Sequence, residues 1–505
     1  MSRITVDIDL NRVEGDLEFQ VDLEDGVVVD ARCVGTLYRG FEQIMIGRAP
    51  RDALVITPRV CGICGTAHLY AATLALEQIA HITPPAHAVQ VRNLCLMAET
   101  LQSDLRQSFL FFTPDFCNAN YAAHPLAAEL RDAFTPLKGS VVRGTLKATR
   151  DVLGIVALFG GQWPHSTYML PGGISQPANS RRILDSRGIL AAVRAWFEQA
   201  VIGGRLEEWM ALDSADALFR WQAAAAGRER SALGLFNRFS RDIGLHRLGR
   251  GTGHLLSYGV NPQPLSEARE LPAGFFNADT QQTETLDQSQ INEHVRHSWF
   301  LDYPGGRHPW EGETIPDHQP GSDRYTWAKA PRYGDKVVQT GPLAELRIAG
   351  DPLISDLLAR EGDNTWLRQF ARLRRAGWLI GAMSETLQAI KASMDQPHYI
   401  DPGIDIWPDG ESYGLVEAAR GGLGHWLRIR NGVIDKYQIV TPTAWNASPR
   451  DSAGRHGHWE QSIIGLPVPD PANPVDIGHI VRSHDPCLVC TVHFIGSQRK
   501  THFNV

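Results

Sequence analysis

The chain has 505 residues, of which 43% are hydrophobic and 21% charged, and its formal net charge at pH 7 is −7. This balance is typical of a globular protein with a large core, and it excludes the basic character of a general nucleic-acid-binding protein. Apolar runs such as 94–98 are too short to cross a bilayer and the N-terminus has charges where a signal peptide is apolar, so we expect a cytoplasmic protein without a membrane span.

The first 34 residues predict an antiparallel β-sheet, because apolar and polar residues alternate on both sides of a turn at Glu24-Asp25-Gly26. Helical spacing of apolar residues follows in five segments, namely 40–45, 86–113, 123–160, 180–212 and 364–394. Residues 250–350 and 411–465 favour strands and ordered loops, with a turn at Asn431-Gly432. We therefore expect a predominantly helical α+β fold, with a central helix bundle and an N-terminal antiparallel β-sheet.

Two Cys-x-x-Cys pairs lie near opposite ends of the chain, and each is followed by a histidine. They are Cys61 and Cys64 with His68, and Cys487 and Cys490 with His493. Four thiolates suit a thiophilic transition metal better than Mg²⁺ or Ca²⁺. The pairs are 423 residues apart (487 − 64), so a shared site would bring the two chain ends together.

The first pair precedes a predicted helix, whose positive N-terminal end favours thiolates. His68 lies one helical turn beyond Cys64 and so faces the same side. The other cysteines, Cys33, Cys95 and Cys117, lie among apolar residues and are expected in the core.

Several kinds of site are compatible with four cysteines. A structural zinc site usually draws its ligands from a few tens of residues, so the long gap disfavours it. A redox-active dithiol needs only one of the two pairs. An iron–sulfur cluster could use all four thiolates, but it would leave His68 and His493 without a role.

The two motifs resemble the N- and C-terminal signatures of the large, catalytic subunit of nickel–iron hydrogenases, in particular the uptake and hydrogen-sensing branch. Other segments of that family's pattern follow in the same order, and the resemblance covers essentially the whole chain. These segments are Arg12-Val13-Glu14-Gly15, Arg39-Gly40-Phe41-Glu42, Pro171-Gly172-Gly173, His308-Pro309-Trp310, Lys329-Ala330-Pro331-Arg332-Tyr333, Gly341-Pro342-Leu343, Arg420-Gly421 and Pro442-Thr443-Ala444-Trp445-Asn446.

The resemblance implies one body over residues 1–493, whose helix bundle buries a bimetallic site. It also implies a tail, 494–505, that a maturation endopeptidase removes after His493. The four motif cysteines, Cys61, Cys64, Cys487 and Cys490, would bind nickel. Cys64 and Cys490 would also bridge to an iron that carries CO and two cyanide ligands.

Further roles follow from the same resemblance. His68 would donate a hydrogen bond to a bridging sulfur and Thr443 one to a cyanide, while Arg420 and Asp485 would cover the open side of the metals. Cys490 and then Glu14 would accept the proton released from H₂, since a carboxylate in a poorly hydrated site can have a raised pKa. A Mg²⁺ ion would be bound by Glu42, His493 and the backbone carbonyl of Ile439.

The implied activity is oxidation of H₂ to protons and electrons. The electrons pass to an iron–sulfur small subunit in a heterodimer or a dimer of heterodimers, and this partner could also attach the otherwise cytoplasmic chain to a membrane. The alternative is an H₂-sensing regulatory hydrogenase with low turnover, although such sensors commonly lack a tail. A respiratory-complex subunit of the same ancestry is disfavoured because those relatives have lost the thiolates.

The sequence departs from the family pattern at some positions. Ala419 replaces a common proline before Arg420, and Asp16 stands where many relatives have histidine. The segment 102–104 is Gln-Ser-Asp, so no role is assigned to its aspartate. Bulky Ile63 and Phe111 resemble oxygen-tolerant and sensing members, and we expect them to restrict the access of O₂.

Overall fold

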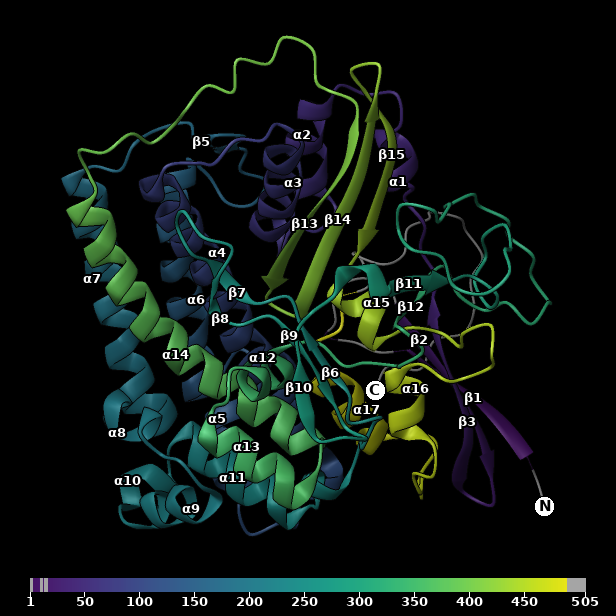
Figure 1. The fold of residues 1–505 in the computed structure, drawn as a ribbon. Helices are drawn as coiled ribbons and strands as arrows, with labels where there is room; N and C mark the ends of the chain where they lie inside the picture. The colour runs from purple at the N-terminus through teal and green to yellow at the C-terminus, as the bar shows by residue number, and fades with distance from the viewer. Residues whose placement is uncertain (1–2, 10–11, 13–16, 488–505) are drawn as a thin grey trace.

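The computed structural model describes residues 3–9, 12 and 17–487. The chain is 46% helical and 18% strand, which confirms the predominantly helical α+β class. The strands form small antiparallel sheets of two or three strands around the helices (Figure 1).

The predicted N-terminal sheet is present as β1 (Arg3–Asp9), β2 (Leu17–Glu24) and β3 (Val27–Gly35), in the order β1-β2-β3. Its apolar face, which includes Phe19 and Cys33, packs against α16 (His458–Ile463). The sheet therefore joins the first residues of the chain to a segment close to the C-terminal cysteine motif.

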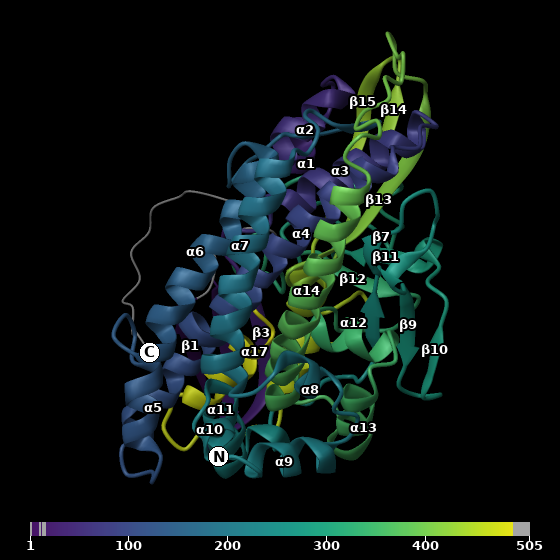
Figure 2. The same cartoon turned by 90° about the vertical axis from the view of Figure 1, so that its left-hand side faces the viewer.

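Four long helices form the bundle. Figure 2 shows α4 (Ala86–Arg106), α6 (Ser140–Gly160), α7 (Ser180–Trp196) and α14 (Thr365–Ala392) side by side. These helices match the long segments predicted from apolar spacing. The segment predicted to extend to residue 113 instead continues past α4 as a π-helical turn at Gln107–Phe112.

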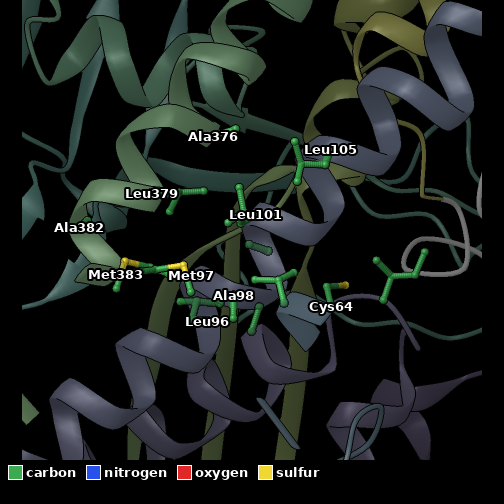
Figure 3. Close-up of a cluster of buried hydrophobic side chains, with 14 of the residues drawn as sticks. Cys64, Leu96, Met97, Ala98, Leu101, Leu105, Ala376, Leu379, Ala382 and Met383 are labelled. Carbon is green, nitrogen blue, oxygen red and sulfur yellow. The ribbon is translucent and has the colours of Figure 1, made fainter. Parts of the chain in front are cut away.

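A second layer places the first cysteine pair beside the bundle. Helix α3 (Gly65–Ile79) packs along a sheet of β13 (Gly410–Ala418), β14 (Gly421–Arg430) and β15 (Val433–Val440) (Figure 1). Figure 3 shows Cys64 at the margin of an apolar cluster that also includes Ala98 and Leu101 of α4. The turn at Asn431-Gly432 has φ values of +52° and +74°, as expected of a tight hairpin.

The remaining elements are shorter. The helices are α1 (Phe41–Met45), α2 (Ala53–Ile56), α5 (Ala127–Phe134), α8 (Leu206–Met210), α9 (Ala215–Ala223), α10 (Ala226–Glu229), α11 (Ala232–Asp242), α12 (Pro342–Ile348), α13 (Pro352–Glu361), α15 (Pro442–Asn446) and α17 (Val475–Ser483). The strands are β4 (Met169–Leu170), β5 (Gly173–Ile174), β6 (Leu255–Ser257), β7 (Val260–Pro262), β8 (Arg269–Leu271), β9 (Gly274–Asn277), β10 (Gln282–Glu284), β11 (Ile291–His294) and β12 (Ala330–Tyr333).

The prediction of only strands and loops in 250–350 and 411–465 was partly wrong. Helix α12 lies in the first segment, and α15 and α16 lie in the second. Each is too short to show the helical period, and α12 and α15 begin with a proline at their first turn. Within the described residues, no helix has the length and apolar character needed to cross a membrane.

Candidate metal centre

The first cysteine pair lies where a short helical turn leads into α3. Cys61 and Cys64 are buried, and Cys64 is the N-cap residue of α3. A side chain at Gly65 would bring its Cβ to 3.0 Å from the carbonyl oxygen of Pro58, so glycine permits the close approach. The first pair thus lies at a helix N-terminus, the position that the sequence analysis expected for it.

The carboxylate of Glu99, on α4, closes the same helix end. It accepts hydrogen bonds from the backbone N–H groups of Thr66 at 3.1 Å and Ala67 at 3.2 Å, and from the Trp163 indole at 3.1 Å. Burial raises the pKa of Glu99 to about 7, while these hydrogen bonds oppose the rise. Sequence reasoning missed Glu99, because a single glutamate in a buried helix belongs to no spacing pattern.

The second cysteine motif reaches the first one. Cys487 Sγ lies 3.5 Å from Cys61 Sγ, although 426 residues separate them in the chain. The backbone N–H of Cys487 donates to the Thr443 hydroxyl oxygen at 3.2 Å, so that hydroxyl can donate its own hydrogen elsewhere. We call Cys61, Cys64 and Cys487 the thiol cluster.

Three residues of the predicted site, Glu14, Cys490 and His493, lie outside the described residues. Asp16, which departs from the family pattern, does so too. Their roles, and that of the tail 494–505, remain predictions.

A buried guanidinium faces the thiol cluster. Arg420 is 4% exposed, its Nε lies 3.0 Å from Asp485 Oδ1, and the same Nε donates to the Asp485 backbone carbonyl at 3.1 Å. Burial lowers the pKa of Arg420, but Asp485 and the three thiols raise it well above its usual range. The structure therefore brings Arg420 and Asp485 together beside the cysteines.

The backbone is unusual at Gly421, which follows Arg420, and at Asp485. A Cβ at Gly421, where φ is +127°, would lie 2.4 Å from Thr340 Oγ1 and 2.6 Å from the nitrogen of Gly341. The Arg420-Gly421 and Gly341-Pro342-Leu343 segments therefore cross at close range. Asp485 has φ +59°, a conformation that non-glycine residues seldom adopt and that its ion pairs help to hold.

A further layer of charge lies behind Asp485. Arg372 Nη1 lies 3.2 Å from Asp485 Oδ2 and 3.0 Å from Asp104 Oδ1, and Arg375 donates to Asp104 at 2.9 and 2.6 Å. All of these groups are buried. We call Asp104, Arg372, Arg375, Arg420 and Asp485 the arginine–aspartate layer. Asp104, left unassigned from sequence, is at its centre.

His68 begins a chain of hydrogen bonds that runs from the thiol cluster into the sheet. His68 Nδ1 lies 3.0 Å from His425 Nε2, and His425 Nδ1 lies 2.8 Å from the Tyr437 hydroxyl. Burial lowers the pKa of His68 to about 4 and that of His425 well below its usual value, so both rings are neutral at pH 7. Sequence reasoning missed His425 and Tyr437.

The tautomers of His68 and His425 are determined if the Tyr437 hydroxyl donates to His425 Nδ1. His425 then donates through Nε2 to His68 Nδ1, and His68 has its remaining hydrogen on Nε2. Among the described residues, nothing accepts a hydrogen bond from that buried nitrogen. His68 is thus prepared to donate to a group that the described residues do not supply.

The structure brings Glu42 and Ile439 together. Glu42 Oε1 accepts from the backbone N–H of Ile439 at 2.9 Å and lies 3.5 Å from Lys329 Nζ, while Oε2 accepts from Thr314. Glu293 is also paired with Lys329, at 3.0 Å, and all five residues line one pocket. The contact to Ile439 uses its N–H, so the predicted carbonyl ligand remains untested.

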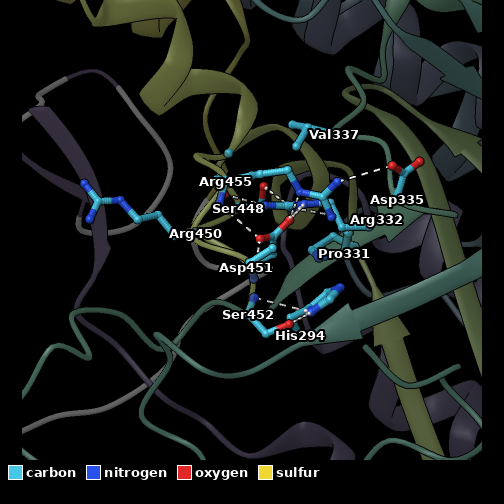
Figure 4. A network of polar contacts seen from close by, with 12 residues as sticks. His294, Pro331, Arg332, Asp335, Val337, Ser448, Arg450, Asp451, Ser452 and Arg455 are labelled. Carbon is cyan, nitrogen blue, oxygen red and sulfur yellow. Dashed lines mark hydrogen bonds and ion pairs between the residues drawn. The ribbon is translucent and has the colours of Figure 1, made fainter. Parts of the chain in front are cut away.

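The segment that contains Thr443 is anchored by a second network (Figure 4). Arg332, on β12, pairs with Asp451 at 3.0 Å and donates to the Ser448 hydroxyl at 3.1 Å and the Pro449 carbonyl at 3.1 Å. These contacts join the Lys329–Tyr333 segment to the turn that follows α15. That turn comes directly after the helix on which Thr443 lies.

The two bulky residues expected to restrict O₂ lie on different elements. Ile63 is 7% exposed and directly precedes Cys64. Phe111 is half-buried in the π-helical turn, and the Arg106 guanidinium carbon lies 5.6 Å from its ring centroid. Their effect on O₂ stays a prediction.

The described residues fit a thiolate-bound metal centre in two respects. The His68 ring and the Arg420 guanidinium each have a buried nitrogen, Nε2 and Nη1, without a hydrogen-bond partner among the described residues. Both belong to side chains beside buried thiols, where a metal-bound group could accept from them. Within those same residues no group of three or more His, Cys, Asp or Glu side chains could hold a metal ion, and Cys490 lies outside them.

Thiols from both chain ends, beneath a buried arginine, define a candidate for a metal-dependent redox enzyme. A family model described as nickel-dependent hydrogenase matches residues 39–134 and 237–493. The chain belongs to the nickel-dependent hydrogenase family, and it is an enzyme of that family.

Individual relatives agree over the full length. The chain is 31% identical to the periplasmic NiFeSe hydrogenase large subunit of Desulfomicrobium baculatum, over 98% of this chain and 96% of that protein. It is 29% identical to the uptake hydrogenase large subunit of Rhodobacter capsulatus, over 98% and 96% of the two chains. A solved structure of H₂-activated Dm. baculatum NiFeSe hydrogenase superposes with a TM-score of 0.83 at 30% identity, covering 97% of this chain and 100% of that one.

Proposed function

We propose that this chain is the catalytic subunit of a hydrogenase that oxidises H₂ to protons and electrons. The observation that carries the proposal is the 3.5 Å contact between the thiols of Cys61 and Cys487, beside a buried Arg420. A nickel–iron centre, when bound, would supply the redox and Lewis-acid chemistry for heterolytic H₂ cleavage.

The ligands would be the four motif cysteines. Cys61, Cys64, Cys487 and Cys490 would bind nickel, and Cys64 and Cys490 would also bind an iron with CO and two cyanides. Thiolates suit nickel because they are soft donors. The Thr443 hydroxyl can donate its hydrogen to cyanide, and so can Arg420 Nη1, which has no hydrogen-bond partner among the described residues.

The surrounding side chains would tune and cover the site. His68 Nε2 would donate to a bridging sulfur, with its tautomer set by His425 and Tyr437. Arg420 and Asp485 would exclude water from the face on which H₂ binds and keep a fixed positive charge there.

Proton transfer would begin at Cys490 Sγ and continue to the carboxylate of Glu14. The ion pairs of Asp115 support this route. Asp115 pairs with Arg12, two residues before Glu14, and it pairs at 2.6 Å with Arg482, which precedes the second cysteine motif. Both segments are therefore tied to the same carboxylate.

The second metal site would contain Glu42, the Ile439 carbonyl and His493, with Mg²⁺ as its ion. Lys329 already neutralises part of the charge of Glu42 and Glu293 there. An ion at this place would link the C-terminal segment to β15.

The partner would be an iron–sulfur small subunit. The relatives are named large subunits or large chains, which implies a small partner. Besides the four motif cysteines, this chain has three others, and Cys33 and Cys95 among them are buried in the core, so few remain to bind iron–sulfur clusters of its own. We also propose one body over 1–493 and cleavage of the tail after His493 by a maturation endopeptidase. An intact mass of metal-loaded protein that still contains residues 494–505 would contradict that cleavage.

Infrared spectroscopy and metal analysis of the purified heterodimer test the proposal. We expect bands from one CO and two cyanides, with nickel and iron bound. A lone zinc without those bands would overturn it. Steady-state H₂ oxidation separates a turnover enzyme from a low-turnover H₂ sensor.

A further inference from the structure

Two buried carboxyl groups lie against each other behind Arg420. Glu345 on α12 and Glu417 near the end of β13 are 1% and 4% exposed, and their side chains are within hydrogen-bonding reach of each other. Oε2 of each is buried, and among the described residues no N–H or O–H group donates to either atom. Two carboxylates in this contact would repel each other strongly, so the contact requires a proton between them.

The other contacts identify the carboxyl group that holds this proton. Glu345 accepts from the guanidinium of Arg375, which favours the ionised form. Within the described part of the chain, Glu417 accepts only from neutral donors, namely the Ser257 hydroxyl at 2.9 Å and the Tyr258 backbone N–H at 2.6 Å. Glu417 is therefore the acid and Glu345 the carboxylate.

The wider electrostatic surroundings agree with this assignment. Burial raises the pKa of both groups, and the neighbouring carboxylate raises the pKa of Glu417 further. Asp104 raises that of Glu345, while Arg375 opposes the rise. Arg269, on β8, also faces Glu417, but its guanidinium donates to the Leu415 carbonyl at 3.1 Å instead.

Arg375 connects the pair to the hydrogenase site. Besides Glu345, it donates to Asp104 and to the backbone carbonyl of Ala419, the residue before Arg420. The charge on Glu345 thus holds a guanidinium that fixes the backbone at Arg420.

We propose that Glu345 and Glu417 share one proton, carried by Glu417, and that the single negative charge of the pair holds Arg375 against Ala419 and so positions Arg420. Both glutamates are then positioning residues. Their effect on Arg420 rests on the function proposed above, whereas the shared proton rests on the contacts of the pair alone.

The shared proton can be tested directly. Infrared spectra of the whole heterodimer should contain a protonated carboxyl band above the amide I region that shifts in D₂O. The band should persist at about pH 9, where Glu99 and Glu460, each with a pKa of about 7, are ionised. It should be absent from Glu417→Gln. If the wild-type enzyme lacks the band at that pH, the shared proton is wrong, whatever its metal content.

The positioning effect predicts an order among three variants. Glu417→Gln keeps a neutral donor beside Glu345 and should leave the CO and cyanide bands within the line width of the wild type. Glu345→Gln moves the charge away from Arg375, and the double variant removes it. We expect progressively larger band shifts and, in the double variant, about a tenfold or greater loss of H₂ oxidation, because a buried guanidinium loses its partner.

A matched control separates positioning from general loss of a buried ion pair. Glu77 pairs with the buried Arg92 at 2.8 Å near the far end of α3. Glu77→Gln should lower the unfolding midpoint without shifting the CO and cyanide bands. Equal band shifts in Glu417→Gln and Glu345→Gln, or a shift in the control as large as in the double variant, would overturn the positioning role. Absence of all CO and cyanide bands from the wild type would refute the proposed function instead.

Discussion

Replacement of Glu99 by glutamine should change how the stability of this hydrogenase depends on pH. The pKa of this buried carboxyl rises from an ordinary 4.5 to about 7. The folded state therefore binds more protons than the unfolded state between these values, and stability is lost as the pH rises through them. Because one pKa unit corresponds to about 1.4 kcal/mol, the loss at Glu99 reaches about 3 kcal/mol.

The assay is the unfolding midpoint of the assembled heterodimer at a series of pH values, compared between the wild type and Glu99→Gln. The amide has one fewer acceptor oxygen for the N–H groups of Thr66 and Ala67, which costs about 1–3 kcal/mol at every pH. Apart from that constant loss, the difference in stability between the wild type and the variant should shrink as the pH rises from about 5 to 8, because only the wild type loses stability over this range.

Glu460 provides the control. Its pKa is also raised to about 7 by burial, and it accepts from Tyr325 and from the backbone N–H of Cys33, beneath the N-terminal sheet. Glu460→Gln should show the same pH trend without changing the CO and cyanide bands, whereas Glu99→Gln, which alters the helix end at Cys64, should shift them. Parallel stability curves for the wild type and Glu99→Gln would refute the reasoning.

Three further predictions concern other parts of the site. Tyr437→Phe removes a buried donor and should destabilise the enzyme by about 1–3 kcal/mol and shift the CO and cyanide bands; unchanged bands would show that the histidine chain does not set the tautomer. Asp104→Asn leaves two buried guanidinium groups short of charge and should cost about 3–5 kcal/mol, measured by chemical denaturation, with slower H₂ oxidation; wild-type stability would contradict this. Ile63→Val combined with Phe111→Leu should speed inhibition by O₂ at an electrode, and an unchanged rate would exclude their role in gas access.

The long elements were predictable because their residues repeat. Helix α14 shows an apolar side over its full length and starts at the N-cap Asn364, so its bounds match the expected 364–394 closely. The first three strands alternate, and a turn with positive φ at Asp25 and Gly26 joins the second to the third. Short helices such as α15 have too few residues for a period, and tertiary contacts fix them instead.

The site was predictable only where its residues form motifs. Cys61 and Cys487 could be paired from sequence because each belongs to a recognisable spacing. His425 could not, because its partner His68 is 357 residues away and a lone histidine in a strand has no signature. The same holds for Glu345 and Glu417, which lie on α12 and near the end of β13 and belong to no common spacing pattern.

Different parts of the chain supply the thiols and most of the charges around Arg420. The thiol cluster comes from the two chain ends, whereas the charges around Arg420, apart from Asp485 beside the second motif, come from α4, α12, α14 and β13. A change such as Cys61→Ser should remove nickel, while Glu345→Gln should retain nickel and change only the surroundings of Arg420. We therefore expect metal binding and the placement of Arg420 to be separable by mutation, because Glu345 and Arg375 lie on other elements than the cysteines.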